Sequence, residues 1–284
     1  MQRAESGIIL LTREEALPSA IRPVRSRSRL TMMLPLLALL ILTSAADLAS
    51  AKNHYCQEKR LKNVKQLTFG QGMNAEGYFS YDDKYITFQA TGAKYGTQCD
   101  QIYQLDLSKD PKDDRNIRRI STGLGSTTCS YFYGNNKDSL YAGNFHKERA
   151  IKMLDQDVNV TTYNTCPQKK CQQKFSPDDP LGKLCNHSYT WDIYNDYDIF
   201  KVNEYGNIIQ QLTNDKFYNA EATFSPDAKI VFTSDRSGDL ELYTMNADGT
   251  NVKQLTNTLG YDGGAFFSRD GSKIVWRASR PNTT

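Results

Sequence analysis

Four polar segments that recur along the chain are its strongest candidates for ligand binding. They are residues 74–76, 127–129, 219–221 and 262–264. Amide and carboxylate groups recognise ligands when several of them converge on one concave place. The candidate binding residues in these segments are Asn74, Glu76, Asn219, Glu221 and Asp262. An alternative role for these groups is to hydrate a channel and to hold neighbouring sheets together.

A second cluster combines thiol and imidazole groups. The cluster contains Cys166, Cys171 and Cys185, with His187 two residues after the last cysteine. Thiolate and imidazole are ligands that zinc prefers. In an oxidising compartment, however, the same cysteines form a disulfide-closed loop. We favour the loop and predict no metal and no cofactor.

Aromatic and acidic residues alternate just after that cluster. Trp191, Tyr194 and Tyr197 are interleaved with Asp196 and Asp198, an arrangement compatible with a sugar platform. We favour the alternative that these rings lead into a strand and pack between sheets. The sequence contains neither a Gly-x-Ser-x-Gly motif nor a glycine-rich phosphate loop. The repeated Ser-Pro-Asp and Asp-Gly segments are interpreted as hairpin turns rather than metal loops.

The elements that must position these residues are internal repeats. Gln-Leu-Thr begins a repeat at Gln66, Gln211 and Gln254, and the last two starts are 43 residues apart. Each copy continues with short runs rich in β-branched and aromatic residues, such as Ile230-Val231-Phe232, separated by turn residues. Several short strands in a period of roughly 40–45 residues are the signature of propeller blades.

The fold class is therefore predicted to be all-β, a β-propeller of four-stranded antiparallel blades. Blades are expected over about 64–110, 117–207 and 208–250, with a partial one over 251–284, and an insertion over 146–191 interrupts the second. Because about three and a half blades do not close a ring, we expect a fragment of a longer protein. The alternatives are a ring completed by another chain and a shortened product without a stable fold.

The front of the chain predicts export. Residues 30–42 are an apolar run preceded by arginines and followed by Ala49-Ser50-Ala51, the order of a secretory signal peptide. We expect cleavage after Ala51, leaving 52–284 as the propeller and no stable membrane span. An uncleaved signal anchor is the alternative. The chain carries 35 basic and 32 acidic residues, without the clustered basic surface that nucleic-acid binding requires.

All six cysteines follow the predicted cleavage site, which favours disulfides. The candidates are Cys56, Cys99, Cys129, Cys166, Cys171 and Cys185. Strand order places Cys99 and Cys129 at the same end of adjacent blades, so we expect them to pair. Cys56 would then tie the insertion to the rest. Asn159, Asn186 and Asn282 begin tripeptides that accept N-linked glycans in a eukaryotic host.

The segments Ala-Glu-Ala-Thr-Phe-Ser-Pro-Asp and Leu-Tyr-Thr-Met-Asn-Ala-Asp-Gly, which contain Glu221 and Met245, resemble the WD-like propeller repeats of the TolB family. The resemblance covers roughly residues 61–281 apart from the insertion. It implies a six-bladed propeller and, in the bacterial periplasmic protein, a role as a protein-interaction hub. Similar propellers precede the hydrolase domain of prolyl-oligopeptidase-type peptidases.

The function that we predict is a secreted scaffold without catalysis of its own. We expect it to bind a protein or peptide at one mouth of the central channel of the propeller. The alternative is a fragment of a propeller enzyme, either a carbohydrate lyase or a peptidase-associated propeller. A His, Arg and acid cluster at the channel mouth would indicate the enzyme.

Overall fold

The computed structural model describes residues 9–10, 63–70, 72–145, 166, 191 and 193–280. The chain divides into two compact units, one over Ile9–Gln66 and the other over Met1–Ile8 with Leu67–Thr284. In the first unit, β1 (Ile9–Leu10) pairs antiparallel with β2 (Lys65–Gln66). The second unit holds all the other described strands.

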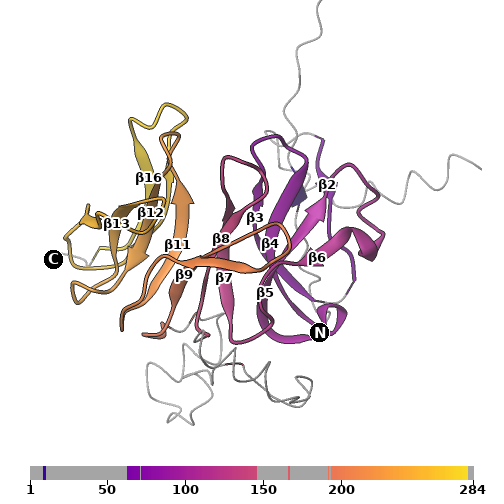
Figure 1. Ribbon diagram of the computed structural model, residues 1–284, viewed down its shortest axis with the longest axis horizontal. Coiled ribbons are helices and arrows are strands. Elements are labelled where there is room, and N and C mark those ends of the chain that lie inside the picture. The colour runs from indigo at the N-terminus through magenta and orange to yellow at the C-terminus, as the bar shows by residue number, and fades with distance from the viewer. Residues whose placement is uncertain are drawn as a thin grey trace, which may run out of the picture. The chain divides into compact units, whose positions relative to one another are not determined.

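The second unit consists of antiparallel sheets whose strands follow one another in chain order (Figure 1). The first sheet contains β3 (Met73–Phe79), β4 (Tyr85–Gly92), β5 (Thr97–Asp106) and β6 (Ile117–Arg119). The second contains β7 (Thr127–Phe132), β8 (Ser139–Gly143), β9 (Asp198–Val202) and β10 (Ile208–Gln211). The third contains β11 (Asn219–Phe224), β12 (Lys229–Ser234), β13 (Glu241–Asn246) and β14 (Lys253–Gln254). The fourth described sheet pairs β15 (Asp262–Phe267) with β16 (Ile274–Ala278).

The sheets are arranged radially, because the first strand of each lies beside the first strand of the next. β3 lies against β7, β7 against β11, and β11 against β15. The short 3-10 helices η2 (Ala93–Tyr95) and η3 (Asp114–Asn116) lie in connections of the first sheet. This is the architecture of a β-propeller. The predicted all-β fold with four-stranded antiparallel blades is confirmed.

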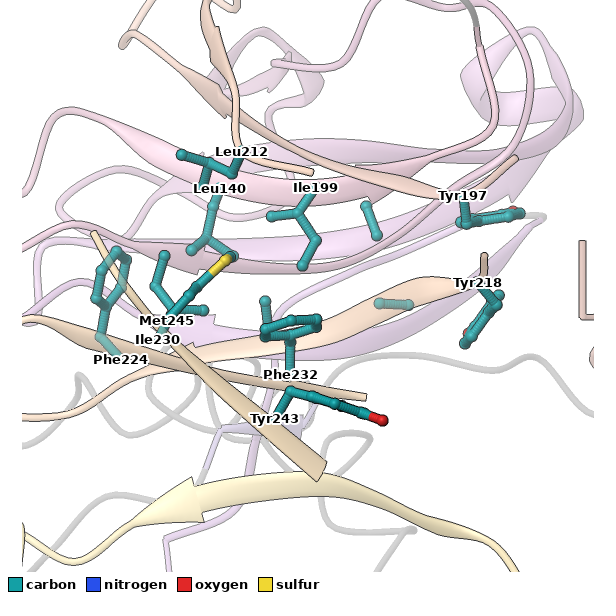
Figure 2. Packing of buried hydrophobic residues seen from close by; sticks show 13 residues of the cluster. Leu140, Tyr197, Ile199, Leu212, Tyr218, Phe224, Ile230, Phe232, Tyr243 and Met245 are labelled. Carbon is teal, nitrogen blue, oxygen red and sulfur yellow. The ribbon is translucent and has the colours of Figure 1, made fainter. Parts of the chain in front are cut away.

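Apolar side chains fill the space between successive sheets. Between the second and third sheets, Leu140 and Ile199 meet Phe232 in a core with no solvent exposure at these three residues (Figure 2). A second core joins the first two sheets through Ile102 and Phe200. Each fully buried side chain of this size contributes about 1.5–3 kcal/mol relative to its exposed state. Stacking therefore buries faces that a single sheet would leave in water.

The sheets are offset by one strand from the sequence repeats. The segments that begin the repeats, or occupy that place, form β6, β10 and β14. Each of them is the fourth strand of a sheet and pairs with the third strand of that sheet. The second sheet therefore begins at Thr127 and ends at the Gln211 motif, and the third begins at Asn219 and ends at the Gln254 motif.

Hydrogen bonds explain why the end of this motif recurs. The hydroxyl of Thr213 accepts a hydrogen bond from the Ile199 amide at 2.9 Å, which extends the pairing of the outer strand. Thr256 accepts from the Leu242 amide in the same way, at 2.8 Å. The intervening Leu212 is buried at 7% exposure and belongs to the core between the second and third sheets.

The Ser-x-Asp segments are hairpin turns, as predicted. Ser225 donates to Asp227 at 2.5 Å and accepts from the Lys229 amide at 2.8 Å, so the serine closes the turn between β11 and β12. Ser80 and Ser268 make the corresponding bonds between the first and second strands of their own sheets.

The predicted pairing of Cys99 with Cys129 is wrong. Cys99, at the start of β5, forms a disulfide with Cys166, and Cys129 is a free thiol. The bridge joins the first sheet to the insertion of the second across a sequence separation of 67 residues. Because Cys166 is oxidised, it is not available as the zinc ligand considered above.

Several predictions concern residues outside the described set. The apolar run and the predicted cleavage site lie there, as do Cys56, Cys171, Cys185 and His187. So do the three glycosylation candidates, Asn159, Asn186 and Asn282. Among the residues that the structure describes, no helix has the length and apolar character needed to cross a membrane.

Candidate functional site at the propeller axis

The first strands of the four sheets, β3, β7, β11 and β15, are called here the axial strands. One backbone position recurs in all four, and the residues at this position line one cavity. Glu76, Cys129 and Glu221 have φ values of 51°, 49° and 55°, in the left-handed region. Gly264 occupies the equivalent place in β15, with φ of 61°. Strand pairing is interrupted here in every sheet. Such β-bulges redirect a side chain out of the sheet, and non-glycine residues hold this conformation at a cost of roughly 1–2 kcal/mol.

Glu221 is held rigidly by groups from two neighbouring sheets. Its carboxylate accepts hydrogen bonds from Thr233 at 2.9 Å, from Tyr261 at 2.7 Å and from the Gly264 amide at 2.9 Å. Arg277 completes the set with an ion pair at 2.8 Å. The side chain of Glu221 is 15% exposed. Its acceptor capacity is already used, so it joins the third sheet to the fourth.

Gly263 makes room for this carboxylate. A Cβ at that position would lie 2.4 Å from Oε2 of Glu221 and 2.3 Å from the hydroxyl of Tyr261. Distances under 3 Å exclude a side chain there unless both partners move. Gly263 is therefore required by the close approach of Glu221 and Tyr261, whereas a Cβ at Gly264 would meet the Arg277 guanidinium at 2.7 Å.

Glu76 differs from Glu221 in having acceptor capacity to spare. Among the described residues its single hydrogen-bond partner is the hydroxyl of Tyr78, and its side chain is exposed. An ionised carboxylate offers about four acceptor sites. Burial raises the pKa of Tyr78, and the neighbouring Cys129 and Glu76 raise it further, so the phenol stays protonated and donates.

Cys129 lies between the two glutamates in chain and sheet order. Burial, followed by the charges of Glu76 and Glu221, raises the pKa of its thiol well above the usual range. Reactive cysteines need the opposite, a lowered pKa beside positive charge. This environment favours a neutral thiol that lines a site over a nucleophile.

Two cavities meet at these residues. Both cavities are lined by Glu76, Cys129, Glu221 and Arg277. The first axial cavity has a volume of about 380 Å³, and its other walls include Tyr78, Phe266 and Trp276. The second axial cavity has a volume of about 460 Å³, and its walls include Asp100, Trp191, Tyr218 and Tyr261. Both are of a size that admits a side chain or a small ligand.

The remaining candidate residues do not line these cavities. Two of them, Asn219 and Asp262, link neighbouring sheets through their backbone amides. The amide of Asn219 donates to the carbonyl of Tyr197 at 3.0 Å, and that of Asp262 donates to Leu240 at 2.8 Å. Thr127 makes the corresponding link through its hydroxyl, which donates to the Asp100 carbonyl at 3.2 Å. Asn74 is buried and accepts from Tyr95.

Asp262 is the most enclosed of these residues. Its Oδ1 accepts from Trp276 at 2.6 Å and pairs with Arg280 at 2.7 Å, and the residue has no solvent exposure. Of the five predicted binding residues, the structure therefore brings Glu76 and Glu221 into the cavity walls. Asn219 and Asp262 link neighbouring sheets, which is part of the alternative role considered from the sequence, and Asn74 is buried within the first sheet.

The aromatic residues considered as a sugar platform pack between the second and third sheets. Tyr197 is fully buried, and the Trp191 and Tyr218 rings pack against it with centroids 6.1 and 5.5 Å away (Figure 2 shows Tyr197 and Tyr218). Tyr194 stacks on Tyr197 at 6.2 Å. Asp198 is buried and accepts from Thr213 at 2.7 Å. Tyr197 thus has no ring face left for a sugar.

Sequence reasoning missed Cys129 and Arg277 as wall residues. The alignment of the polar segments does carry the signal for Cys129, because it is the third residue of its segment, as Glu76 and Glu221 are of theirs. Arg277 reaches Glu221 from the second strand of another sheet. No sequence spacing encodes that contact.

No protein-family model matches this chain, and no curated protein matches it in sequence. Similar solved structures include TolB from Acinetobacter baumannii, with 17% identity and a TM-score of 0.48 over 78% of this chain and 42% of that one. A chain of a nidogen/laminin complex has 12% identity and a TM-score of 0.48, over 76% and 60% of the two chains. A puromycin-hydrolyzing peptidase from Mycobacterium tuberculosis has 11% identity and a TM-score of 0.45, over 78% and 32%.

The chain therefore spans less than half of the TolB chain that it matches. These neighbours include a TolB protein. The propeller assignment itself rests on the sheets of this chain.

Proposed function

We propose that this chain is a protein- or peptide-binding scaffold whose ligand enters the axial cavities. The observation that carries the proposal is the convergence of strained bulge residues on two adjoining cavities. Backbone strain of this kind persists where the surrounding structure enforces it, and it clusters at functional sites. Here the strain serves to aim Glu76 and Cys129 at the axis rather than to complete a sheet.

The composition of the walls supports binding rather than thiol chemistry. The cavities combine aromatic rings with a few charged groups, as peptide-binding pockets do. The raised pKa of Cys129 disfavours a nucleophilic thiolate. We also propose that the chain is exported, on the order of arginines, apolar run and Ala-Ser-Ala, and N-terminal sequencing is expected to begin at Lys52.

Selection from a library of random twelve-residue peptides displayed on phage tests the binding proposal. The exported chain is the bait, and Ala75→Trp is the blocking variant, because Ala75 is exposed and lines the second axial cavity. Lys216→Trp is the matched control, an exposed loop residue that lines neither axial cavity. Selected peptides should bind wild type and the control and lose at least about tenfold in affinity for Ala75→Trp, a change of about 1.4 kcal/mol. Equal binding to all three, or no enrichment, would overturn the proposal.

A further inference from the structure

We propose that the axial cavities select a cationic group, an ammonium or guanidinium, with Glu76 as the carboxylate that receives it. This inference rests on the proposed function, because it names the chemistry of the ligand at the same site. Three observations support it: the charged groups in the cavity walls, the unused hydrogen-bond acceptor sites of Glu76, and the aromatic rings beside Glu76.

Among the side chains that the structure describes, carboxylates outnumber cationic groups in the walls of both cavities. In the first axial cavity, Glu76 and Glu221 face the single guanidinium of Arg277. In the second, Asp100 also lines the wall and takes part in interactions of its own. Clefts lined by one sign of charge concentrate ligands of the opposite sign. The raised pKa values of Tyr78, Cys129 and Tyr261 agree with this negative surrounding, in addition to the effect of burial.

The two glutamates have separate roles. Glu221 is neutralised by Arg277 and saturated by donors from the protein. Glu76 forms no ion pair in the described part of the chain, although its charge acts on nearby Arg277, and its carboxylate is exposed beside the cavities. An incoming cation would therefore pair with Glu76 without displacing a protein group.

Aromatic rings stand next to this carboxylate. Tyr78 lies with its ring centroid 5.7 Å from that of Phe266, and both line the first axial cavity together with Trp276. Aromatic faces attract ammonium and guanidinium groups through the ring quadrupole. They also pack against the aliphatic stem of a lysine or arginine side chain. The carboxylate therefore matches the charged end of a basic side chain, and the aromatic walls match its aliphatic stem.

Cys129 provides a direct probe of the proposed potential, because its half-buried thiol lines both cavities. Peptide mapping would follow its modification by 2-aminoethyl methanethiosulfonate, a cation, and by 2-sulfonatoethyl methanethiosulfonate, an anion. The ratio of the two rates is divided by the same ratio for a free thiol in solution. Any change in thiolate fraction affects both reagents equally and cancels.

In wild type, the ratio of the cationic to the anionic modification rate should exceed the ratio for a free thiol by about tenfold or more, as expected for a cleft of one sign of charge. Glu76→Gln should lower that preference several-fold. Glu204→Gln, in the turn between β9 and β10 and outside both axial cavities, should leave it unchanged. A ratio at the solution value in wild type, or no change with Glu76→Gln, would overturn the inference.

Ligand probes identify the source of the cation. N-acetyl-lysine methylamide, N-acetyl-glutamine methylamide and butylammonium are titrated into the full chain and followed by NMR. Tighter binding of the lysine derivative than of butylammonium supports a peptide side chain, and equal binding of these two supports a free amine of the same chemistry. Equal binding of the lysine and glutamine derivatives would contradict cation selection.

The two proposals fail separately. Selected peptides that occupy the cavities without lysine or arginine would leave the scaffold function standing and overturn cation selection. A strong preference for the cationic reagent without any selected peptide would do the reverse.

Discussion

A single backbone position in each axial strand decides which side chains face the axis. Glu76, Cys129 and Glu221 adopt left-handed φ values there, although none of them is glycine. The fourth strand uses Gly264 at the same place, which is the residue that this conformation favours. Of the three non-glycine residues, Glu221 uses this conformation to join the third sheet to the fourth, whereas Glu76 and Cys129 retain the strain in the cavity walls.

Glu76→Gly should therefore stabilise the fold while removing the receiving carboxylate. Relief of the left-handed conformation is expected to raise the free energy of unfolding by about 0.5 kcal/mol, after the loss of the bond from Tyr78. Urea denaturation measures it, with Glu76→Gln as the control that keeps the strain. An earlier unfolding midpoint for Glu76→Gly than for Glu76→Gln would show that Glu76 is not strained.

Asp198 makes the fold sensitive to pH. Burial raises its pKa to about 6, and the charge of Asp215 adds to the shift. An aspartate in the unfolded chain titrates near 3.9. Because the folded state binds this proton more tightly, the stabilisation is fully present below about pH 4 and is lost as pH rises through about 6.

Asp198→Asn imitates the protonated side chain. Its melting temperature should exceed that of wild type by about 2–4 °C at pH 7.5 and match it near pH 4. The full shift is discounted because hydrogen bonds from Thr213 and Gln211 stabilise the ionised carboxylate. Calorimetry at both pH values checks this. A lower melting temperature for the variant at pH 7.5 would contradict the assignment.

At the scale of elements, the Gln-Leu-Thr motif acts by closing the sheet that precedes it. Its leucine enters a core where a neighbouring sheet is present to cover it. Leu212 is 7% exposed, between the second and third sheets, whereas the equivalent Leu255 is 47% exposed. The same residue type in the same motif therefore has two environments, which offers a matched comparison.

Leu212→Ala should cost about 2–4 kcal/mol of unfolding free energy through lost burial and a cavity. Leu255→Ala should cost less than about 1 kcal/mol, because much of its surface is already in water. Chemical denaturation of the two variants gives the comparison. Equal losses would mean that Leu255 is covered in solution.

The sequence predicts strands, turns and repeat length well, because alternation and turn residues are local signals. Lys229, Ile230 and their neighbours form β12 as their composition indicates. The sheet to which a Gln-Leu-Thr strand pairs is not a local property. The run around Gln211 lies between two blades in sequence, and only its pairing with Phe200 assigns it to the second.

The candidate site shows the same division. Glu76 and Glu221 were predictable because they hold equivalent positions in the repeats. Their different roles were not, because Glu221 depends on Tyr261 and Arg277 from the next sheet. The disulfide of Cys99 was also mispredicted, since its partner Cys166 lies in an insertion that has no place in the repeat pattern.

At the scale of the whole molecule, that disulfide joins the insertion to the first sheet. A link across 67 residues restricts the unfolded chain. Cys166→Ser should lower the unfolding free energy by about 2–4 kcal/mol. Non-reducing peptide mapping should recover the Cys99 and Cys166 peptides together. Recovery of Cys99 with Cys129 would show that the axial thiol is absent in solution.

The axial cavities are a property of the whole molecule, because they depend on four sheets placed around one axis. The most direct test is NMR shift mapping of the isotopically labelled exported chain with a peptide selected on it. The amide signals of Cys129 and Gly264 should shift on binding, with those of Glu76 and Glu221. Shifts confined to the turn around Asn135, with Cys129 and Gly264 unmoved, would place the ligand elsewhere and contradict the account.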